Sequence, residues 1–284
     1  MARLHKIQVT LYTIIFFLGI MENGLVIWIA GFRMKKTINA LWFLNLAIAD
    51  CLCCASITLR VIWKAELIKS SKHIYKTLMT ISLIIPMSAS VLLLTAMSID
   101  RWVSVMWPFW AKVHRTRKLV RNTAVVIWML CLVVTGLVCY FSLFYDSRAN
   151  IQLIETSLLI RLVMLFVIPF LLIFISYVTI FFKLRKSKRP QRSQRPYRII
   201  TTVILCFFIC WSPLHFWPLI PMDGRDALQL EIEYTIIFFL TYLNSCINPI
   251  IYVFMDQDFR HGFLRSIPFK VEIALSEPPD DTSR

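Results

Sequence analysis

The sequence predicts an all-α membrane protein, a bundle of seven transmembrane helices, and three observations support this fold class. Of its 284 residues, 58% are hydrophobic and 17% are charged, which is too little polar surface for a water-soluble domain. Seven apolar runs reach the length of about 20 residues that a helix needs to cross a bilayer, and all are too long for barrel strands. The spacers are short, so one domain (8–254) holds the runs, at 8–31, 39–62, 75–104, 121–143, 156–182, 198–220 and 229–254.

The first run follows a segment of seven residues (1–7) and is expected to stay in the protein. Basic residues precede its apolar core, as in a secretory signal, but no small-x-small cleavage site follows and the run continues through Trp28. Glu22 and Asn23 interrupt this run, and polar side chains inside a membrane need partners. We expect Asn23 to hydrogen-bond with Asp50 in the second run and with the backbone of the seventh. The residues indicate no partner for Glu22.

The basic residues predict the orientation. The connections after the first, third and fifth runs hold fifteen Lys and Arg residues, against seven on the opposite side. By the positive-inside rule this makes the N-terminus extracellular and the tail (268–284) cytoplasmic, in a multi-pass protein of the plasma membrane. A net charge of +15 could suggest nucleic acid, but its placement beside the spans favours anionic membrane lipids, and no nucleic-acid partner is expected.

Several polar residues share one depth in the membrane. At about 1.5 Å per residue, Asp50 lies halfway along the second run and Ser90 halfway along the third, with Asn244, Ser245 and Asn248 in the inner half of the seventh. Two interpretations stay open. A small hard cation could bind among these oxygens, or the residues could form a packing network without an ion.

The third run ends on Asp100-Arg101-Trp102. About 36 Å of helix separates Thr77 from Arg101, so the arginine reaches the inner face. Taken alone, this pattern is typical of an arginine that extends to the membrane surface.

Prolines interrupt the late runs at Pro169, Pro213 and Pro249, and each removes a backbone hydrogen bond and bends its helix. Cys-Trp-Ser-Pro at 210–213 places Trp211 beside one bend, about which the inner end of the sixth helix could swing. Taken alone, a proline of this kind is more often a feature of helix packing than a conformational switch.

Two arginines lie in the outer halves of apolar runs. Arg161 lies about 12 Å outward of Pro169, where a cation should face an interior cavity and bind an anion. The alternative is an ion pair with Glu155 or another acid of the outer loops. Arg60, in the outer part of the second run, is a second cation.

The cysteines give no sign of a disulfide or of catalysis. All eight fall inside predicted spans, so no extracellular disulfide is expected. The chain shows neither a nucleophile with its base nor a set of metal ligands. We therefore expect no enzymatic activity and no cofactor, apart from the cation considered above.

Taken together and in order, these features resemble the rhodopsin-like G-protein-coupled receptors over about residues 12–275. The matching stretches are GxxxNG-LV around Asn23, LNLAIAD, SxxLLLTAMSIDRW, Trp128, Pro169 with Tyr177, FFICWSP and NSCINPIIY. MDQDFRHGFL then looks like the family's short amphipathic eighth helix (255–267). GLVIWIAGFRMKKTINALWFLNLAIAD, WPFWAKVHRT and YVFMDQDFR look like the chemoattractant branch, which includes formyl-peptide, chemerin, anaphylatoxin and second prostaglandin D2 receptors.

The resemblance implies roles for the matching positions. The family's sodium site, which favours the inactive state, matches Asp50, Ser90, Asn244, Ser245 and Asn248. The activation switch matches Phe207, Trp211, Pro213, Asn248, Pro249 and Tyr252. Coupling to a heterotrimeric G protein, in this branch usually of the inhibitory class, matches Asp100, Arg101, Tyr177 and Tyr252, with Asp100 holding Arg101 beforehand. An anionic peptide or lipid would place its acidic group on Arg161, beside His215, Trp211, Met87 and Arg60.

The chain departs from the family mainly in its outer half. Lys76 stands where the family has a bridged cysteine, and the loop DSRANIQLIETS lacks the cysteine's partner. Pro86 and Trp102 replace the usual asparagine and the usual tyrosine or cysteine. These losses support a second function, a non-signalling protein that acts as a decoy, relic or heteromer partner. A transporter or channel would show inverted repeats or paired broken helices, which we do not find.

Overall fold

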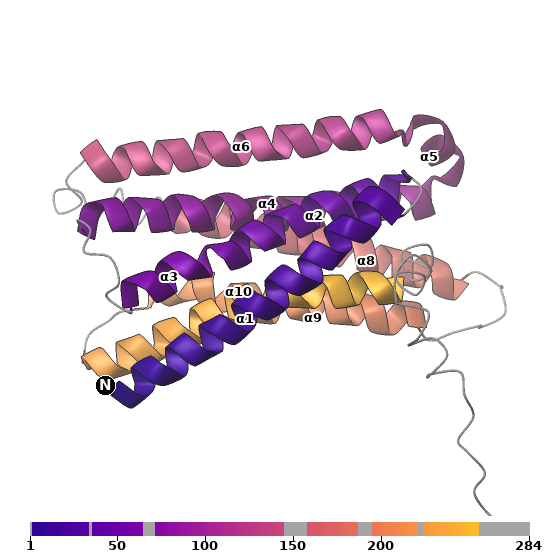
Figure 1. The fold of residues 1–284 in the computed structure, drawn as a ribbon. Coiled ribbons are helices and arrows are strands. Elements are labelled where there is room, and N and C mark those ends of the chain that lie inside the picture. Colours follow the sequence, from indigo (N-terminus) through magenta and orange to yellow (C-terminus); the bar gives the residue numbers. More distant parts are fainter. Residues whose placement is uncertain are drawn as a thin grey trace, which may run out of the picture.

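The computed structural model describes residues 2–33, 36–64, 72–144, 158–186, 195–220 and 224–255, which are helical apart from short connections (Figure 1). The first two spans are α1 (Ala2–Trp28) with the π-helical turn η1 (Ile29–Arg33), and α2 (Ile38–Ala55) with α3 (Ile57–Lys64). The third and fourth are α4 (Lys72–Met106) and α6 (Arg117–Phe144), with the short α5 (Pro108–His114) between them. The last three contain η2 (Val163–Val167) with α8 (Ile168–Lys186), α9 (Arg195–Phe216) with η3 (Trp217–Leu219), and α10 (Ala227–Met255).

Length and composition identify the membrane-spanning segments. Six helical segments of the described chain are long and apolar enough to cross a membrane: His5–Arg33, Ile38–Ile62, Thr77–Met106, Arg117–Leu137, Leu158–Lys186 and Ala227–Ile251. The sixth span in chain order is α9, whose described apolar part is shorter, Ile204–Leu219. The seven predicted runs are thus helices in the predicted order, which confirms the fold class.

The structure tests the predicted terminal segments only in part. Helix α1 already begins at Ala2, inside the segment 1–7 that the sequence assigns to the N-terminus. Met255 ends α10, and the rest of the predicted eighth helix (255–267) and the tail (268–284) lie outside the described residues.

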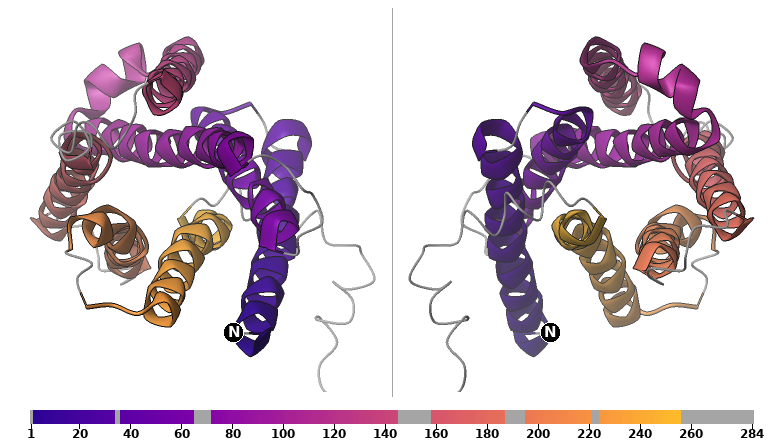
Figure 2. Two further views of the ribbon diagram at one scale, coloured as in Figure 1. Left: turned by 90° about the vertical axis from the view of Figure 1, so that its left-hand side faces the viewer. Right: turned by 90° about the vertical axis from the view of Figure 1, so that its right-hand side faces the viewer.

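Helix α4 lies inside the bundle and packs against α2, α6 and α8. Helix α6 packs on α4 and α2 and lies at the periphery, as the end-on views show (Figure 2). Its outer face presents Val125, Val126 and Met129, each more than half exposed. An exposed apolar face of this kind suits contact with lipid, because hydrocarbon requires no polar surface.

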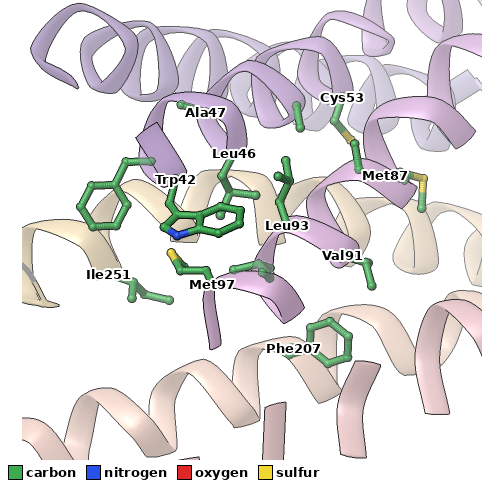
Figure 3. Packing of buried hydrophobic residues seen from close by; sticks show 14 of the residues in the cluster. Trp42, Leu46, Ala47, Cys53, Met87, Val91, Leu93, Met97, Phe207 and Ile251 are labelled. Carbon is green, nitrogen blue, oxygen red and sulfur yellow. The ribbon is translucent and has the colours of Figure 1, made fainter. Parts of the chain in front are cut away.

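The interior is a continuous layer of apolar side chains from several spans. In Figure 3, Trp42 and Leu46 of α2 lie beside Leu93 and Met97 of α4, in a cluster that extends to Phe207 of α9. Dense packing of this kind fixes the relative positions of the helices. A shift of one helix would open voids, and the side chains around a void lose dispersion attraction. The polar residues discussed below are therefore held by a rigid apolar frame.

The second span changes direction at Ser56, where no proline is present. The Ser56 N–H is shared between the carbonyls of Leu52 and Cys53, both at 3.1 Å, and its Oγ donates to Cys53 O at 2.6 Å. A serine hydroxyl that bonds to its own helix commonly bends it. This break separates α2 from α3, and the sequence patterns did not indicate it.

The fifth span changes pitch just before Pro169. Five residues, Val163–Val167, form a π-helical turn, in which the Ile168 N–H donates to the Val163 carbonyl. Pro169 has no N–H to donate to the carbonyl four residues earlier. Because that α-helical bond is missing, the chain can adopt a wider π-helical turn just before the proline. In contrast, Pro213 and Pro249 lie inside continuous helices, as does Pro86.

Candidate functional site

A cavity of about 640 Å³ lies among the outer halves of the second, third, fifth, sixth and seventh spans. Most of its wall is apolar, and half of the lining residues come from α4. The lining includes all five predicted ligand-binding residues, Arg60, Met87, Arg161, Trp211 and His215. The structure therefore brings together side chains from four spans that the sequence could place only by depth.

Arg161 forms a hydrogen bond across the cavity wall to α9. Its Nη2 donates to the Leu214 carbonyl at 3.3 Å, and its buried Nε has no hydrogen-bond partner among the described residues. The Leu214 carbonyl is available because Pro218, four residues later, has no N–H to donate to it. A neutral carbonyl leaves the charge of Arg161 uncompensated. Glu155, the alternative ion-pair partner, lies outside the described residues.

Below Arg161, aromatic rings connect the cavity to the core. The ring centroids of His215 and Trp211 lie 6.3 Å apart, and Phe207 lies 6.3 Å from Trp211 on the far side. His215 and Trp211 are both 3% exposed, yet Trp211 Nε1 and both ring nitrogens of His215 have no partner among the described residues. Buried N–H groups are nearly always paired, so unpaired ones in a cavity wall indicate a site that is completed by a polar ligand or water.

Arg60 supplies a second guanidinium from α3. Its Cζ lies 3.7 Å from the ring centroid of Phe238 on α10, a cation–π contact, and its Nε has no hydrogen-bond partner among the described residues. The described residues that line the cavity include no Asp or Glu. Arg60 and Arg161 thus give the cavity a positive potential.

A polar layer lies beneath the cavity. Asp50 is fully buried and accepts hydrogen bonds from Ser90 Oγ at 3.0 Å and Asn248 Nδ2 at 2.8 Å. Asn244 and Ser245 are also buried, at 3% exposure, and Asn244 Nδ2 has no partner in the described structure. The layer therefore joins the second, third and seventh spans as predicted, and it retains unused hydrogen-bonding capacity.

Asn23 bonds to backbone and not to Asp50. Its Nδ2 donates to the Ser245 carbonyl at 2.9 Å, on the seventh span as predicted, and to the Gly19 carbonyl at 3.0 Å. The predicted bond to Asp50 is wrong, because both Nδ2 hydrogens of Asn23 bond to these carbonyls and its Oδ1 cannot donate to a carboxylate. Glu22, for which the residues indicated no partner, also has none for its buried Oε2 among the described residues.

At the inner end, Asp100 binds Arg115 and not its neighbour Arg101. Arg115 at the C-terminus of α5 donates from Nε to Asp100 Oδ1 at 2.8 Å and from Nη2 to Oδ2 at 2.6 Å. Its Nη2 also donates to Asn39 Oδ1 of α2 at 2.9 Å. The expectation that Asp100 holds Arg101 is therefore wrong, because consecutive residues on a helix point in different directions.

The other predicted coupling residues lie near this inner end. Arg101 Nε and the hydroxyl of the buried Tyr177 have no hydrogen-bond partner among the described residues. Tyr252 belongs to α10, but its side chain lies outside the described residues. The sequence shows Arg115 as one of the basic residues that follow the third run, and residue spacing does not predict its pairing with Asp100.

Comparison with known proteins identifies the family. The model of the 7 transmembrane receptor (rhodopsin family) matches residues 22–252. The chain belongs to the rhodopsin family of seven-transmembrane receptors. This receptor is 36% identical to the C3a anaphylatoxin chemotactic receptor of Danio rerio over 98% of the chain and 80% of that relative. It is 32% identical to formyl peptide receptor 2 of Mus musculus, over 98% of the chain and 87% of the relative.

Further similarity places the receptor in the chemoattractant branch. It is 34% identical to chemerin-like receptor 1 of Sus scrofa over 97% of the chain and 84% of that relative. The receptor is thus a multi-pass membrane protein of a signalling family, with a G protein and a ligand as the partners that this family implies. Its eight cysteines, all within the described residues, are free thiols.

Proposed function

We propose that this receptor binds an anionic peptide or lipid in the outer cavity, with the ligand's acidic group on Arg161, and signals through G proteins of the inhibitory class. In this proposal it lies in the plasma membrane with its N-terminus outside. Helix α5 lies at the end of the bundle opposite the N-terminus (Figure 1). The basic residues Arg115, which caps α5, and Arg117, which begins α6, therefore support this orientation.

The uncompensated charge of Arg161 carries the proposal. Among the described residues, its guanidinium bonds only to the neutral Leu214 carbonyl, in a cavity lined largely by apolar side chains. A buried charge is costly unless it is paired, and a carboxylate can accept two parallel bonds from one guanidinium. The unpaired donors of Trp211 and His215 in the same wall offer further bonds to an acidic ligand.

The rings beneath the cavity suggest how binding reaches the inner end. A ligand group against His215 and Trp211 would press on Phe207 through direct ring contacts. The backbone hydrogen bonds that Pro213 and Pro249 cannot form then allow the inner parts of α9 and α10 to move. Arg101 and Tyr177 have unused polar groups at that end, which a docking G protein or a rearranged Tyr252 and Asn248 would satisfy.

Replacing Arg161 with glutamine tests the ligand proposal. Formylated peptides, chemerin peptides, anaphylatoxin tails and prostaglandins would be screened for G-protein activation, normalised to surface copies and with and without pertussis toxin. For an active acid, we expect Arg161→Gln to lower potency about tenfold or more, since a charge-assisted bond is lost. Its uncharged amide or ester should act equally on both receptors.

Arg121→Gln is the matched control, because Arg121 is exposed at the start of α6. Equal potency of the acid on wild type and Arg161→Gln would contradict the proposed site. Good surface expression without any response, in wild type and in Arg101→Gln alike, would favour a non-signalling protein. A response that persists in pertussis toxin would exclude the inhibitory class.

We also propose that a sodium ion binds at Asp50 and favours the inactive state. The residues fit such an ion: the Asp50 carboxylate is fully buried, its hydrogen-bond partners among the described residues are neutral, and it lies beside the Ser90 hydroxyl. The Asn244 amide, with its free Nδ2, could turn its oxygen toward the ion. Hard oxygen donors of this kind suit a small hard cation.

Asp50→Asn should remove the sodium sensitivity of agonist binding. In wild type, we expect agonist affinity to fall when sodium replaces choline at constant ionic strength, because the ion stabilises the state that binds agonist poorly. In Asp50→Asn, affinities in the two salts should coincide. A sodium effect of equal size in the variant would rule out the site, and no effect in wild type would favour a packing network.

A further inference from the structure

The cavity contains a cation that the proposed ligand contact does not use. Arg60 lies in the wall formed by the second and seventh spans, with its Cζ 3.7 Å from the Phe238 ring centroid. Arg161 lies in the wall formed by the fifth and sixth spans, bonded to Leu214. From this arrangement we infer that the ligand carries two acidic groups joined by an apolar body, one bound by Arg161 and the other by Arg60. The inference rests on the proposed function.

The charges of the described lining residues favour a ligand with two anionic groups. Two guanidinium groups line it, and no Asp or Glu is among its described lining residues. The ion pairs between described residues, Arg115 with Asp100 and Arg225 with Glu233, use other arginines and other acids. A ligand with one acidic group would leave one cation unpaired in a largely apolar space, where an isolated charge is strongly unfavourable.

The cation–π contact does not replace an anion at Arg60. Such contacts contribute about 0.5 to 2 kcal/mol, which is far less than the cost of removing an unpaired cation from water. The contact does fix the plane of the guanidinium against Phe238, and the unpaired Nε is available for one further bond. A preorganised guanidinium loses less side-chain freedom when it binds a carboxylate.

The apolar lining of the cavity determines the ligand's middle part. The cavity that holds both cations is also lined by the apolar side chains of Met79, Leu83, Ile84, Met87, Val91 and Leu165. Each arginine is held by a different helix, Arg60 by α10 and Arg161 by α9, so a ligand that binds both has to contact two walls of the cavity. A hydrocarbon segment with an acid at each end satisfies both cations and buries its chain against the walls.

The test compares diacids with their monomethyl esters on the purified full-length receptor. Octanedioate, dodecanedioate and hexadecanedioate, each with its ester, would be titrated while the midpoint of thermal unfolding is followed. We expect at least one diacid to bind wild type about tenfold more tightly than its ester, because the second charged contact is worth that factor. Arg60→Gln should abolish this preference, and Arg60→Lys, which keeps the charge, should retain part of it. Arg121→Gln should behave as wild type.

The outcomes separate this inference from the proposed function. If every diacid binds no more tightly than its ester while both still require Arg161, the two-anion inference is overturned and the Arg161 site stands. If Arg161→Gln leaves the binding of diacids and esters unchanged, the proposed site itself fails. If Arg60→Gln does not fold, the comparison of diacid with ester on wild type and the Arg60→Lys variant still test the inference. A preference for the diacid that Arg60→Lys leaves wholly unchanged would also contradict a role for Arg60.

Discussion

Replacing Gly19 with alanine is expected to destabilise the bundle by about 1 to 3 kcal/mol, because the new methyl group has no room. A Cβ at Gly19 would lie 2.2 Å from Cys54 Sγ, 3.1 Å from Cys54 Cβ and 3.3 Å from Cys246 Sγ. Helices α1, α2 and α10 therefore meet at this residue. Cys54 is fully buried, so its sulfur has little open space into which it can rotate. A clear drop in the thermal unfolding midpoint and in surface expression should follow.

The chain provides a matched control for this change. Gly136 lies in α6, and a Cβ there would meet no atom within 4 Å. Gly136→Ala should be neutral or slightly stabilising, because alanine is the better helix former by about 1 kcal/mol. Adding Cys54→Ala to Gly19→Ala should restore part of the lost stability. Equal unfolding midpoints for Gly19→Ala and Gly136→Ala would show that α1 does not approach α2 this closely.

Replacing Arg115 with glutamine is expected to cost about 2 kcal/mol of stability. The Arg115 guanidinium holds Asp100 through two bonds and Asn39 through a third, which ties α2, α4 and α5 together. Breaking a buried pair typically costs about 3 to 5 kcal/mol. The side chains of Arg115 and Asp100 are 24% and 12% exposed, so solvent screening lowers this value. Thermal unfolding of the two receptors in the same detergent measures the difference.

A double-mutant cycle then identifies the partner of Asp100. Arg115→Gln and Asp100→Asn should be strongly non-additive, because each change removes the same contact. Arg117→Gln is the control, since the hydrogen bond from Arg117 to the Lys36 carbonyl is exposed and should contribute little. Additive effects of Arg115→Gln and Asp100→Asn, combined with non-additive effects of Arg101→Gln and Asp100→Asn, would restore the neighbour pair expected from the sequence.

Much of the candidate site followed from depth along the spans. A helix rises by a constant amount per residue, so counting residues placed Asp50, Ser90 and Asn248 in one layer, and the structure joins them by hydrogen bonds. The same count put Arg161 in the outer half of the fifth span, outward of Pro169, and Arg161 lines the cavity. Depth alone was sufficient here because all of these residues face the interior of one bundle.

Counting residues along the helices could not predict which hydrogen-bond partner each polar side chain has. Counting gives the height of a side chain but not the direction in which it points after neighbouring helices tilt and break. Asn23 and Asp50 lie at similar depths, yet Asn23 donates to backbone carbonyls. Asp100 turns toward a residue fifteen positions later because α5 returns the chain beneath α4.

The sequence by itself determined the fold class, the order of the spans and the family, because each depends on local properties that survive without tertiary contacts. Apolar length defines a span, and ordered motifs define a family. Only the tertiary structure decided that the Leu214 carbonyl binds Arg161, that Arg60 lies on Phe238 and that Gly19 allows Cys54 to approach. Each of these contacts joins residues far apart in the chain, and its geometry depends on helix tilts and breaks, such as that at Ser56, set by packing of the whole bundle.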